Sequence, residues 1–123
     1  MEKKVMIIDD DRDAMKVIKD ALTADGCMVE SIMTIDDIYP NLQSFKPNLF
    51  ILDINLKGGD GRSLCNKIKA DLSYHHIPIV LLTSLDFEKI GEIDCEADAI
   101  LGKPIDMKNL SLTINNLIGD LSQ

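Results

Sequence analysis

Five short apolar segments, separated by longer stretches with a helical pattern, constrain the fold of this chain more than any other feature. They have the length of β-strands, are rich in Ile, Val and Leu, and cover residues 4–9, 28–33, 49–53, 77–83 and 97–101. The first, third and fourth are almost entirely apolar, as is typical of parallel strands covered by helices on both faces. Residues 28–33 mix polar with apolar side chains, which indicates a strand at the edge of the sheet.

The stretches between these strands predict amphipathic helices. One apolar face recurs at helical spacing in the first stretch, at Ala14, Val17, Ile18, Ala21 and Leu22. A similar face at residues 110–121 predicts the last helix, and further helices are expected near 36–45, 62–72 and, with a poorer pattern, 86–95. Asp11 and Asp60 are expected to cap the helices that follow them.

This alternation predicts an α/β fold, in the form of a three-layer, doubly wound, five-stranded parallel sheet with helices on both faces and right-handed crossovers. The 123 residues suit one compact domain and are too few for two, so we expect a single domain over residues 1–123. Sheets of this kind bind ligands at the carboxyl ends of their strands, near the switch in strand order.

Polar residues stand where the strands are expected to end. Asp9 and Asp10 end the first strand, Asp53 ends the third, Thr83 ends the fourth, and Lys103 follows the fifth. Carboxylates gathered at one rim repel one another, and a hard divalent cation such as Mg²⁺, which prefers oxygen ligands, would offset that repulsion. A carboxylate can also attack phosphorus, while a lysine and a threonine can hold the phosphoryl oxygens.

The charge balance narrows the classes of partner. With 13 Lys and Arg against 21 Asp and Glu, the formal net charge is −8, which argues against direct binding of nucleic acid or of an anionic membrane. No apolar run approaches the roughly 20 residues that span a bilayer, and none suits a signal peptide. Cys27, Cys65 and Cys95 show no metal-ligand spacing, so we expect free thiols and a cytoplasmic location.

Five motifs in this order resemble the receiver domain of bacterial two-component response regulators, including the chemotaxis regulators. They are "IIDDD", "ILDINL", "GGDG", "IPIVLLTS" and "LGKP". The resemblance covers essentially the whole chain and implies a flavodoxin-like sheet with strand order 2-1-3-4-5. It also implies that Asp53 is the phosphoacceptor, taking a phosphoryl group from a sensor histidine kinase or a phosphotransfer protein.

The resemblance further implies roles for the residues around Asp53. Asp10 would bind Mg²⁺ (or Mn²⁺) directly, Asp9 mainly through water, and the main-chain carbonyl of Asn55 would be a further ligand beside Asp53. Thr83 and Lys103 would hold the phosphoryl group, and the bond between Lys103 and the proline after it would be cis. The chain would be a switch rather than a turnover enzyme, limited to phosphotransfer onto itself and slow self-dephosphorylation. It would signal to an output partner or to an output domain C-terminal to it.

The chain departs from the usual pattern of the family at several positions. Lys57 and Gly59 replace a proline and a methionine, so the segment "NLKGGDG" is expected to be a mobile loop. Ile100 replaces an aromatic residue and is expected to pack inward in a single rotamer. Leu85 is expected to crowd the hydrolytic water and slow dephosphorylation.

Two other functions are compatible with parts of the pattern. A haloacid-dehalogenase-like phosphatase would use Asp9 as its nucleophile; Asp11 fits its motif, but Asp13 replaces the required Thr or Val. A phosphorylation-independent, receiver-like binding module would not need the intact set of rim residues. The kinase, the stimulus and the output are not indicated by the sequence.

Overall fold

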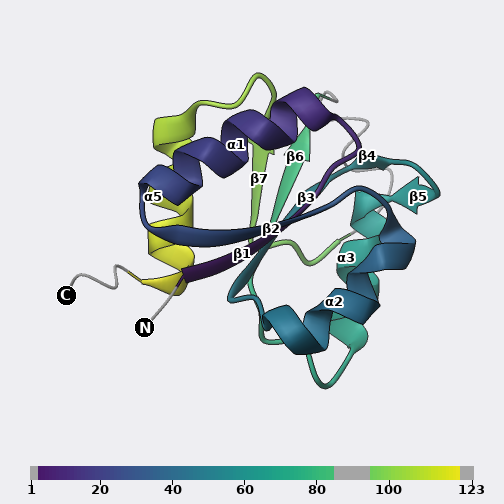
Figure 1. The fold of residues 1–123 in the computed structure, drawn as a ribbon. Helices are drawn as coiled ribbons and strands as arrows, with labels where there is room; N and C mark the ends of the chain where they lie inside the picture. The colour runs from purple at the N-terminus through teal and green to yellow at the C-terminus, as the bar shows by residue number, and fades with distance from the viewer. Residues whose placement is uncertain (1–2, 85–94, 120–123) are drawn as a thin grey trace.

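The strands form one five-stranded parallel sheet with the order β2-β1-β3-β6-β7 (Figure 1). We describe residues 3–84 and 95–119 of a computed structural model of the chain. The strands are β1 (Lys3–Ile8), β2 (Cys27–Ile32), β3 (Leu49–Asp53), β6 (Ile79–Thr83) and β7 (Ala99–Gly102). The predicted order is therefore confirmed, with β2 at one edge as expected.

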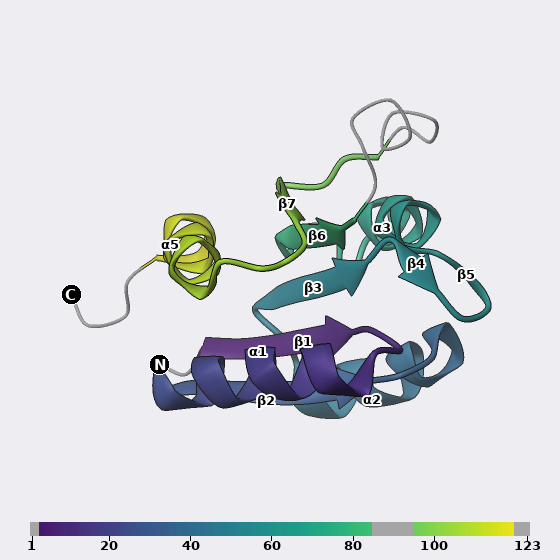
Figure 2. The same cartoon turned by 90° about the horizontal axis from the view of Figure 1, so that it is seen from above.

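Helices cover both faces of the sheet, so the fold is the expected three-layer, doubly wound arrangement (Figures 1 and 2). One face carries α1 (Arg12–Ala24) and α5 (Met107–Ile118). The other carries α2 (Ile38–Phe45), which follows the short 3-10 helix η1 (Ile35–Asp37), and α3 (Gly61–Ala70). The expected helix over 86–95 and the expectation for Leu85 lie outside the described residues. In the part of the chain that the structure describes, no helix is long and apolar enough to cross a membrane.

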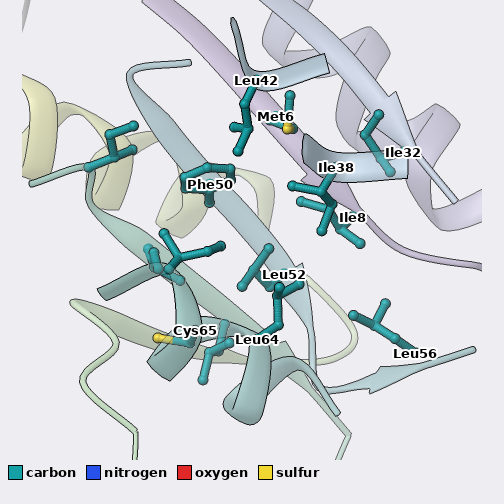
Figure 3. Packing of buried hydrophobic residues seen from close by; sticks show 14 of the residues in the cluster. Met6, Ile8, Ile32, Ile38, Leu42, Phe50, Leu52, Leu56, Leu64 and Cys65 are labelled. Atoms are coloured by element: carbon teal, nitrogen blue, oxygen red, sulfur yellow. The ribbon is translucent and has the colours of Figure 1, made fainter. Parts of the chain in front are cut away.

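Alternate residues of the central strands supply two separate cores. In β3, Phe50 and Leu52 face α2 and α3, whereas Leu49 and Ile51 face α1 and α5. All four side chains are fully buried, which explains why the strand reads as a continuous apolar run. Figure 3 shows the first core, in which Phe50 and Leu52 lie among side chains of α2 and α3.

The helix caps follow the sequence prediction. Asp11 accepts hydrogen bonds from the main-chain N–H groups of Asp13 and Ala14 at the start of α1. Asp60 accepts one from the N–H of Arg62 at the start of α3. Each carboxylate satisfies N–H groups that the first turn of a helix leaves without a partner, and it does so at the positive end of the helix dipole.

The segment "NLKGGDG", for which the sequence predicts a mobile loop, has a defined secondary structure. It contains an antiparallel hairpin made of β4 (Asn55–Leu56) and β5 (Gly59–Asp60). Lys57 and Gly58 form its turn, and Gly58 has a φ of 84°, a conformation that glycine adopts without a steric penalty. The glycines that suggested a loop thus permit a tight turn between two short strands.

Ile100 does not pack inward, so this expectation is wrong. Ile100 is 42% exposed, although Leu81, with which it pairs on β6, is fully buried. The adjacent residues Ala99 and Leu101 pack against the core under α1 and α5. Because side chains alternate along a strand, Ile100 lies on the opposite face, at the edge of the sheet.

Candidate functional site

The site lies at the carboxyl ends of the strands, where the order of the sheet reverses. From β1 the chain passes to β2 on one side, and it then returns to form β3 on the other side. Ile8 pairs with both Ile32 and Leu52, so the residues that follow, Asp9 and Asp53, come at the same level on neighbouring strands. The parallel register therefore brings together two carboxylates that are 44 positions apart in the sequence.

Three carboxylates meet at this point. One ligand oxygen from each of Asp9, Asp10 and Asp53 lies within 4.8 Å of the others. The Asp9 side chain is completely buried, the Asp53 side chain is 8% exposed, and Asp10 is partly exposed. Oxygen ligands at this spacing fit a small, hard divalent cation, which would also relieve the repulsion among them.

Main-chain N–H groups fix the orientation of both buried carboxylates. The N–H of Asp11 donates to Oδ1 of Asp9 at 2.9 Å, and the N–H of Asn55 donates to Oδ1 of Asp53 at 3.0 Å. The second bond places the main chain of Asn55, at the start of the hairpin, directly beside the Asp53 carboxylate. In each residue the other oxygen, Oδ2, is directed toward Lys103.

Lys103 supplies the positive charge of the site. Its Nζ lies 2.6 Å from Oδ2 of Asp53 and 3.4 Å from Oδ2 of Asp9. Its own N–H donates to the carbonyl oxygen of Thr83 at 2.7 Å, which fixes its main chain to the end of β6. The bond between Lys103 and Pro104 is cis, as the family resemblance implied.

The close packing of charges shifts the pKa values of two groups. Burial, with a contribution from the charge of Asp53, raises the pKa of Asp9 to about 6, although the N–H of Asp11 and the Lys103 ammonium oppose this rise. Burial alone would lower the pKa of Lys103, but its hydrogen bond to Asp53 and the charges of both carboxylates outweigh burial and raise it. Lys103 is therefore protonated at neutral pH, while Asp9 ionises at a higher pH than a free aspartate does.

Thr83 completes the set of predicted residues at the rim. It is the last residue of β6, is 3% exposed, and follows Leu82, which pairs directly with Asp53. Its position on the neighbouring strand brings it one residue beyond the level of the Asp53 main chain. The structure thus gathers Asp9, Asp10, Asp53, Thr83 and Lys103 at the carboxyl ends of four strands, with Asn55 beside them.

Two features of the segment that follows Asp53 were not predicted from the sequence. A Cβ atom at Gly61 would overlap the main-chain carbonyl oxygen of Asp53, and the N–H of Gly61 donates to the carbonyl oxygen of Ile54 at 2.7 Å. Arg62 is only 5% exposed and holds Asp60 through two side-chain bonds, Nε to Oδ1 at 2.9 Å and Nη2 to Oδ2 at 2.7 Å. The glycine of "GDG" was a signal for the first feature; the sequence contains no comparable signal for the burial of Arg62.

Residues 5–115 match the family described as the response regulator receiver domain. The chain is 31% identical to the polar-differentiation response regulator DivK of Brucella anthropi over 126 aligned residues, covering 98% of this chain and 99% of DivK. It is 29% identical to the response regulator PleD of Caulobacter vibrioides over 119 residues, covering 95% of this chain. The match spans only 26% of the length of PleD.

Solved structures with the same fold include a response regulator of Chloroflexus aurantiacus. It superimposes with a TM-score of 0.89 at 24% sequence identity, and the match covers 98% of this chain and all of the other. At this level of identity the similarity concerns the fold, which agrees with the flavodoxin-like arrangement of the sheet.

Proposed function

Because this chain belongs to the receiver domain family of two-component response regulators, we propose that Asp53 accepts a phosphoryl group from a phosphohistidine. The observation that carries this proposal is the contact of 2.6 Å between Lys103 Nζ and Asp53 Oδ2, at the centre of the acidic cluster. A cation beside one carboxylate oxygen can stabilise the negative charge that develops when that carboxylate attacks phosphorus. The resulting acyl phosphate alters the surface around the rim, and that change is the signal.

Burial favours Asp53 over Asp9 as the nucleophile. The Asp53 side chain retains some exposure, whereas that of Asp9 has none, so an incoming phosphodonor can reach only the former. This difference in burial opposes the alternative of a dehalogenase-like phosphatase that uses Asp9.

The acidic cluster is a binding site for a divalent cation, which we propose to be Mg²⁺, with Mn²⁺ as a substitute. Asp10 and Asp53 would bind it directly, Asp9 mainly through water, and the main-chain carbonyl of Asn55 would be a further ligand. When bound, the cation neutralises negative charge on the phosphodonor and on the acceptor carboxylate.

Thr83 and Lys103 have complementary roles in this proposal. Lys103 Nζ exchanges its contact with Asp53 Oδ2 for a contact with a phosphoryl oxygen once that oxygen carries the charge. Its ammonium is held ready for this exchange by the second carboxylate, that of Asp9. The Thr83 hydroxyl donates a neutral hydrogen bond to another phosphoryl oxygen.

A groove beside Lys103 suits the docking of the phosphodonor. Its volume is about 370 Å³, and apolar side chains of α1 and of the segment before α5 line most of it, among them Val17, Ile105 and Met107. Val17 is 60% exposed, so its apolar side chain is open to a partner at this groove. We infer that a helix of a sensor histidine kinase or phosphotransfer protein packs here and so brings its phosphohistidine to the rim.

Residues 1–123 act as one receiver domain that does not turn over a separate substrate, and its output is a partner protein or a domain C-terminal to it. Neither nucleic acid nor a membrane is a direct partner, in agreement with a net charge of −8. We assign the domain to the cytoplasm, where ATP supplies histidine kinases and where free thiols such as that of Cys27 are common.

Labelling with acetyl phosphate tests the function. In the presence of Mg²⁺, intact-mass spectrometry should detect one added phosphoryl group on the wild-type protein, and EDTA should prevent its addition. Asp53→Asn should abolish labelling, whereas Asp20→Asn, which changes an exposed carboxylate in α1, should leave it intact. Labelling of the Asp53→Asn variant at the wild-type rate would refute the assignment, and turnover of p-nitrophenyl phosphate lost in Asp9→Asn alone would favour the phosphatase.

A further inference from the structure

We propose that Cys65 and Cys95 form a reversible intramolecular disulfide that joins α3 to the segment leading into β7. Cys65 lies in α3 and is fully buried, and Cys95 lies ahead of β7 and is partly buried. The two thiols are separated in the sequence but meet in the same region of the fold.

Two contacts show that α3 and residues 95–98 lie side by side. The N–H of Glu96 donates to Oδ1 of Asn66 at 3.3 Å, and Lys69 Nζ lies 2.9 Å from Oδ2 of Asp98. Moving along α3 from Asn66 to Lys69 thus corresponds to moving along the other segment from Glu96 to Asp98. The same Asp98 oxygen also accepts a hydrogen bond from the N–H of Ile79 at 2.7 Å, which fixes the segment to the start of β6 as well.

The two cysteines adjoin this contact in the sequence. Cys65 directly precedes Asn66, and Cys95 directly precedes Glu96. Cys65 belongs to the core between the sheet, α2 and α3, and Cys95 packs against that same core. Burial raises the pKa of the Cys65 thiol to about 11, and the charge of the Cys95 thiol adds to the rise.

The third cysteine provides an internal contrast. Cys27 lies in β2 and belongs to the other core, between the sheet and α1 with α5. The sheet therefore separates it from Cys65 and Cys95, so neither can pair with it without unfolding.

Hydrogen peroxide is the oxidant in the proposed reaction. The Cys95 sulfur, which is the more exposed, attacks one peroxide oxygen; the O–O bond breaks and gives Cys95 sulfenic acid and water. The Cys65 sulfur then attacks the Cys95 sulfur, so that an S–S bond forms and the S–O bond breaks. The departing hydroxide takes the proton of the Cys65 thiol. In total, two thiols lose two protons and two electrons, and one peroxide becomes two waters.

The disulfide would restrict the unfolded chain by closing the loop from residue 65 to residue 95. In the chain-entropy description, closing a loop of this length with a disulfide raises the free energy of unfolding. For a domain of this size the Tm is expected to rise by roughly 5–10 °C. It would also fix to α3 the segment ahead of β7, the strand after which Lys103 lies. The pairing can be tested without phosphorylation, so it stands apart from the function of Asp53.

The experiment compares the purified, reduced protein before and after treatment with hydrogen peroxide. Tryptic mass spectrometry under non-reducing conditions should detect a disulfide between peptides 63–67 and 90–108, and the intact mass should fall by about 2 Da. Dithiothreitol should restore the original mass and Tm. Cys27→Ser, as the matched control, should retain the crosslink, whereas Cys95→Ser and Cys65→Ala should each lose it.

Because Cys65 is buried, far-UV circular dichroism should verify that Cys65→Ala folds, and Cys95→Ser provides the independent test at a more exposed position. Several results would overturn the proposal: a crosslink that contains Cys27, disulfide-linked dimers on a non-reducing gel, oxidation that adds oxygen to Cys95 without a crosslink, or no reaction at all.

Discussion

Gly61, the first residue of α3, lies directly against the main chain of Asp53. Any residue with a Cβ atom at this position would overlap the Asp53 carbonyl oxygen. The N–H of Gly61 also donates to the carbonyl oxygen of Ile54, so the helix begins in direct contact with the end of β3. The hairpin β4–β5 lies in the chain between the end of β3 and the start of α3. The position of the proposed phosphoacceptor therefore depends on how closely α3 approaches the strand.

Gly61→Ala should move this contact apart. We expect a loss of about 1–3 kcal/mol in the free energy of unfolding, because the overlap is with main-chain atoms that cannot rotate away. The displaced Asp53 carboxylate should also slow labelling by acetyl phosphate, by about 10-fold. Gly102→Ala is the matched control, since a Cβ there would make only an ordinary contact of 4.0 Å with the Thr83 carbonyl oxygen. Equal behaviour of the two variants in urea unfolding and in labelling would contradict this account.

Lys103→Met should affect the binding of Mg²⁺ and the transfer of the phosphoryl group in opposite directions. The ammonium competes with a cation for Asp9 and Asp53, so its removal should tighten Mg²⁺ binding by about 10-fold. Labelling of Asp53 should slow by at least about 10-fold, because the ammonium of Lys103 is no longer there to hold a phosphoryl oxygen. Calorimetry and mass spectrometry measure the two effects. Lys16→Met, the control, changes the net charge equally at an exposed position and should alter neither Mg²⁺ affinity nor labelling. Slower labelling with unchanged Mg²⁺ affinity in Lys103→Met would show that Lys103 does not compete with Mg²⁺ for the carboxylates.

The stability of the metal-free protein should depend on pH through Asp9. Its pKa is about 6 in the folded protein against 3.8 for the free side chain, so the folded state retains a proton that the unfolded chain has already lost. The free energy of unfolding should consequently fall by about 2 kcal/mol as the pH rises from about 4 to about 6. Urea unfolding in EDTA should reveal this decrease in the wild-type protein and its absence in Asp9→Asn.

Mg²⁺ should reverse that trend, because a cation binds the ionised carboxylates and not the protonated ones. The stabilisation that Mg²⁺ provides should accordingly grow over the same pH interval. Asp20→Asn removes an exposed carboxylate and should preserve the wild-type dependence. A free energy of unfolding that rises between pH 4 and 6 in EDTA would mean that folding does not raise the pKa of Asp9.

Ile100→Ala should cost little stability, less than about 1 kcal/mol, because this side chain is already 42% exposed. Leu81→Ala, at the residue paired with Ile100 on β6, should cost about 2–5 kcal/mol, since it leaves a cavity in a filled core. Urea denaturation of the two variants measures the difference directly. Comparable losses would mean that Ile100 is buried in solution.

The sequence was sufficient to predict the parallel strands of the sheet and the residues that lie at its rim. Long apolar runs such as β3 identify buried parallel strands, and parallel strands place their last residues at one edge. That reasoning alone predicts that Asp53 and Lys103 lie at the same edge of the sheet. The strand order 2-1-3-4-5, in contrast, came from the family resemblance, because periodicity does not determine which strands are neighbours.

Three features could not be predicted, each for a physical reason. The strands β4 and β5 have two residues each, too few for an alternating pattern to be visible. The outward orientation of Ile100 depends on which residues of β7 face α5, and a one-residue change of register would reverse it. The burial of Arg62 depends on its pairing with Asp60, whereas arginine is ordinarily an exposed residue.

Because odd and even residues of a central strand such as Leu49–Asp53 pack into different cores, a single residue inserted there would exchange all the side chains beyond it between the two faces. Insertions are therefore expected to be tolerated at the opposite end of the sheet from the carboxylates, in the turn over residues 71–76. Leu72 in this turn is 89% exposed. A fluorescent label or an affinity tag placed at this position would report on the domain while leaving both cores and the rim undisturbed.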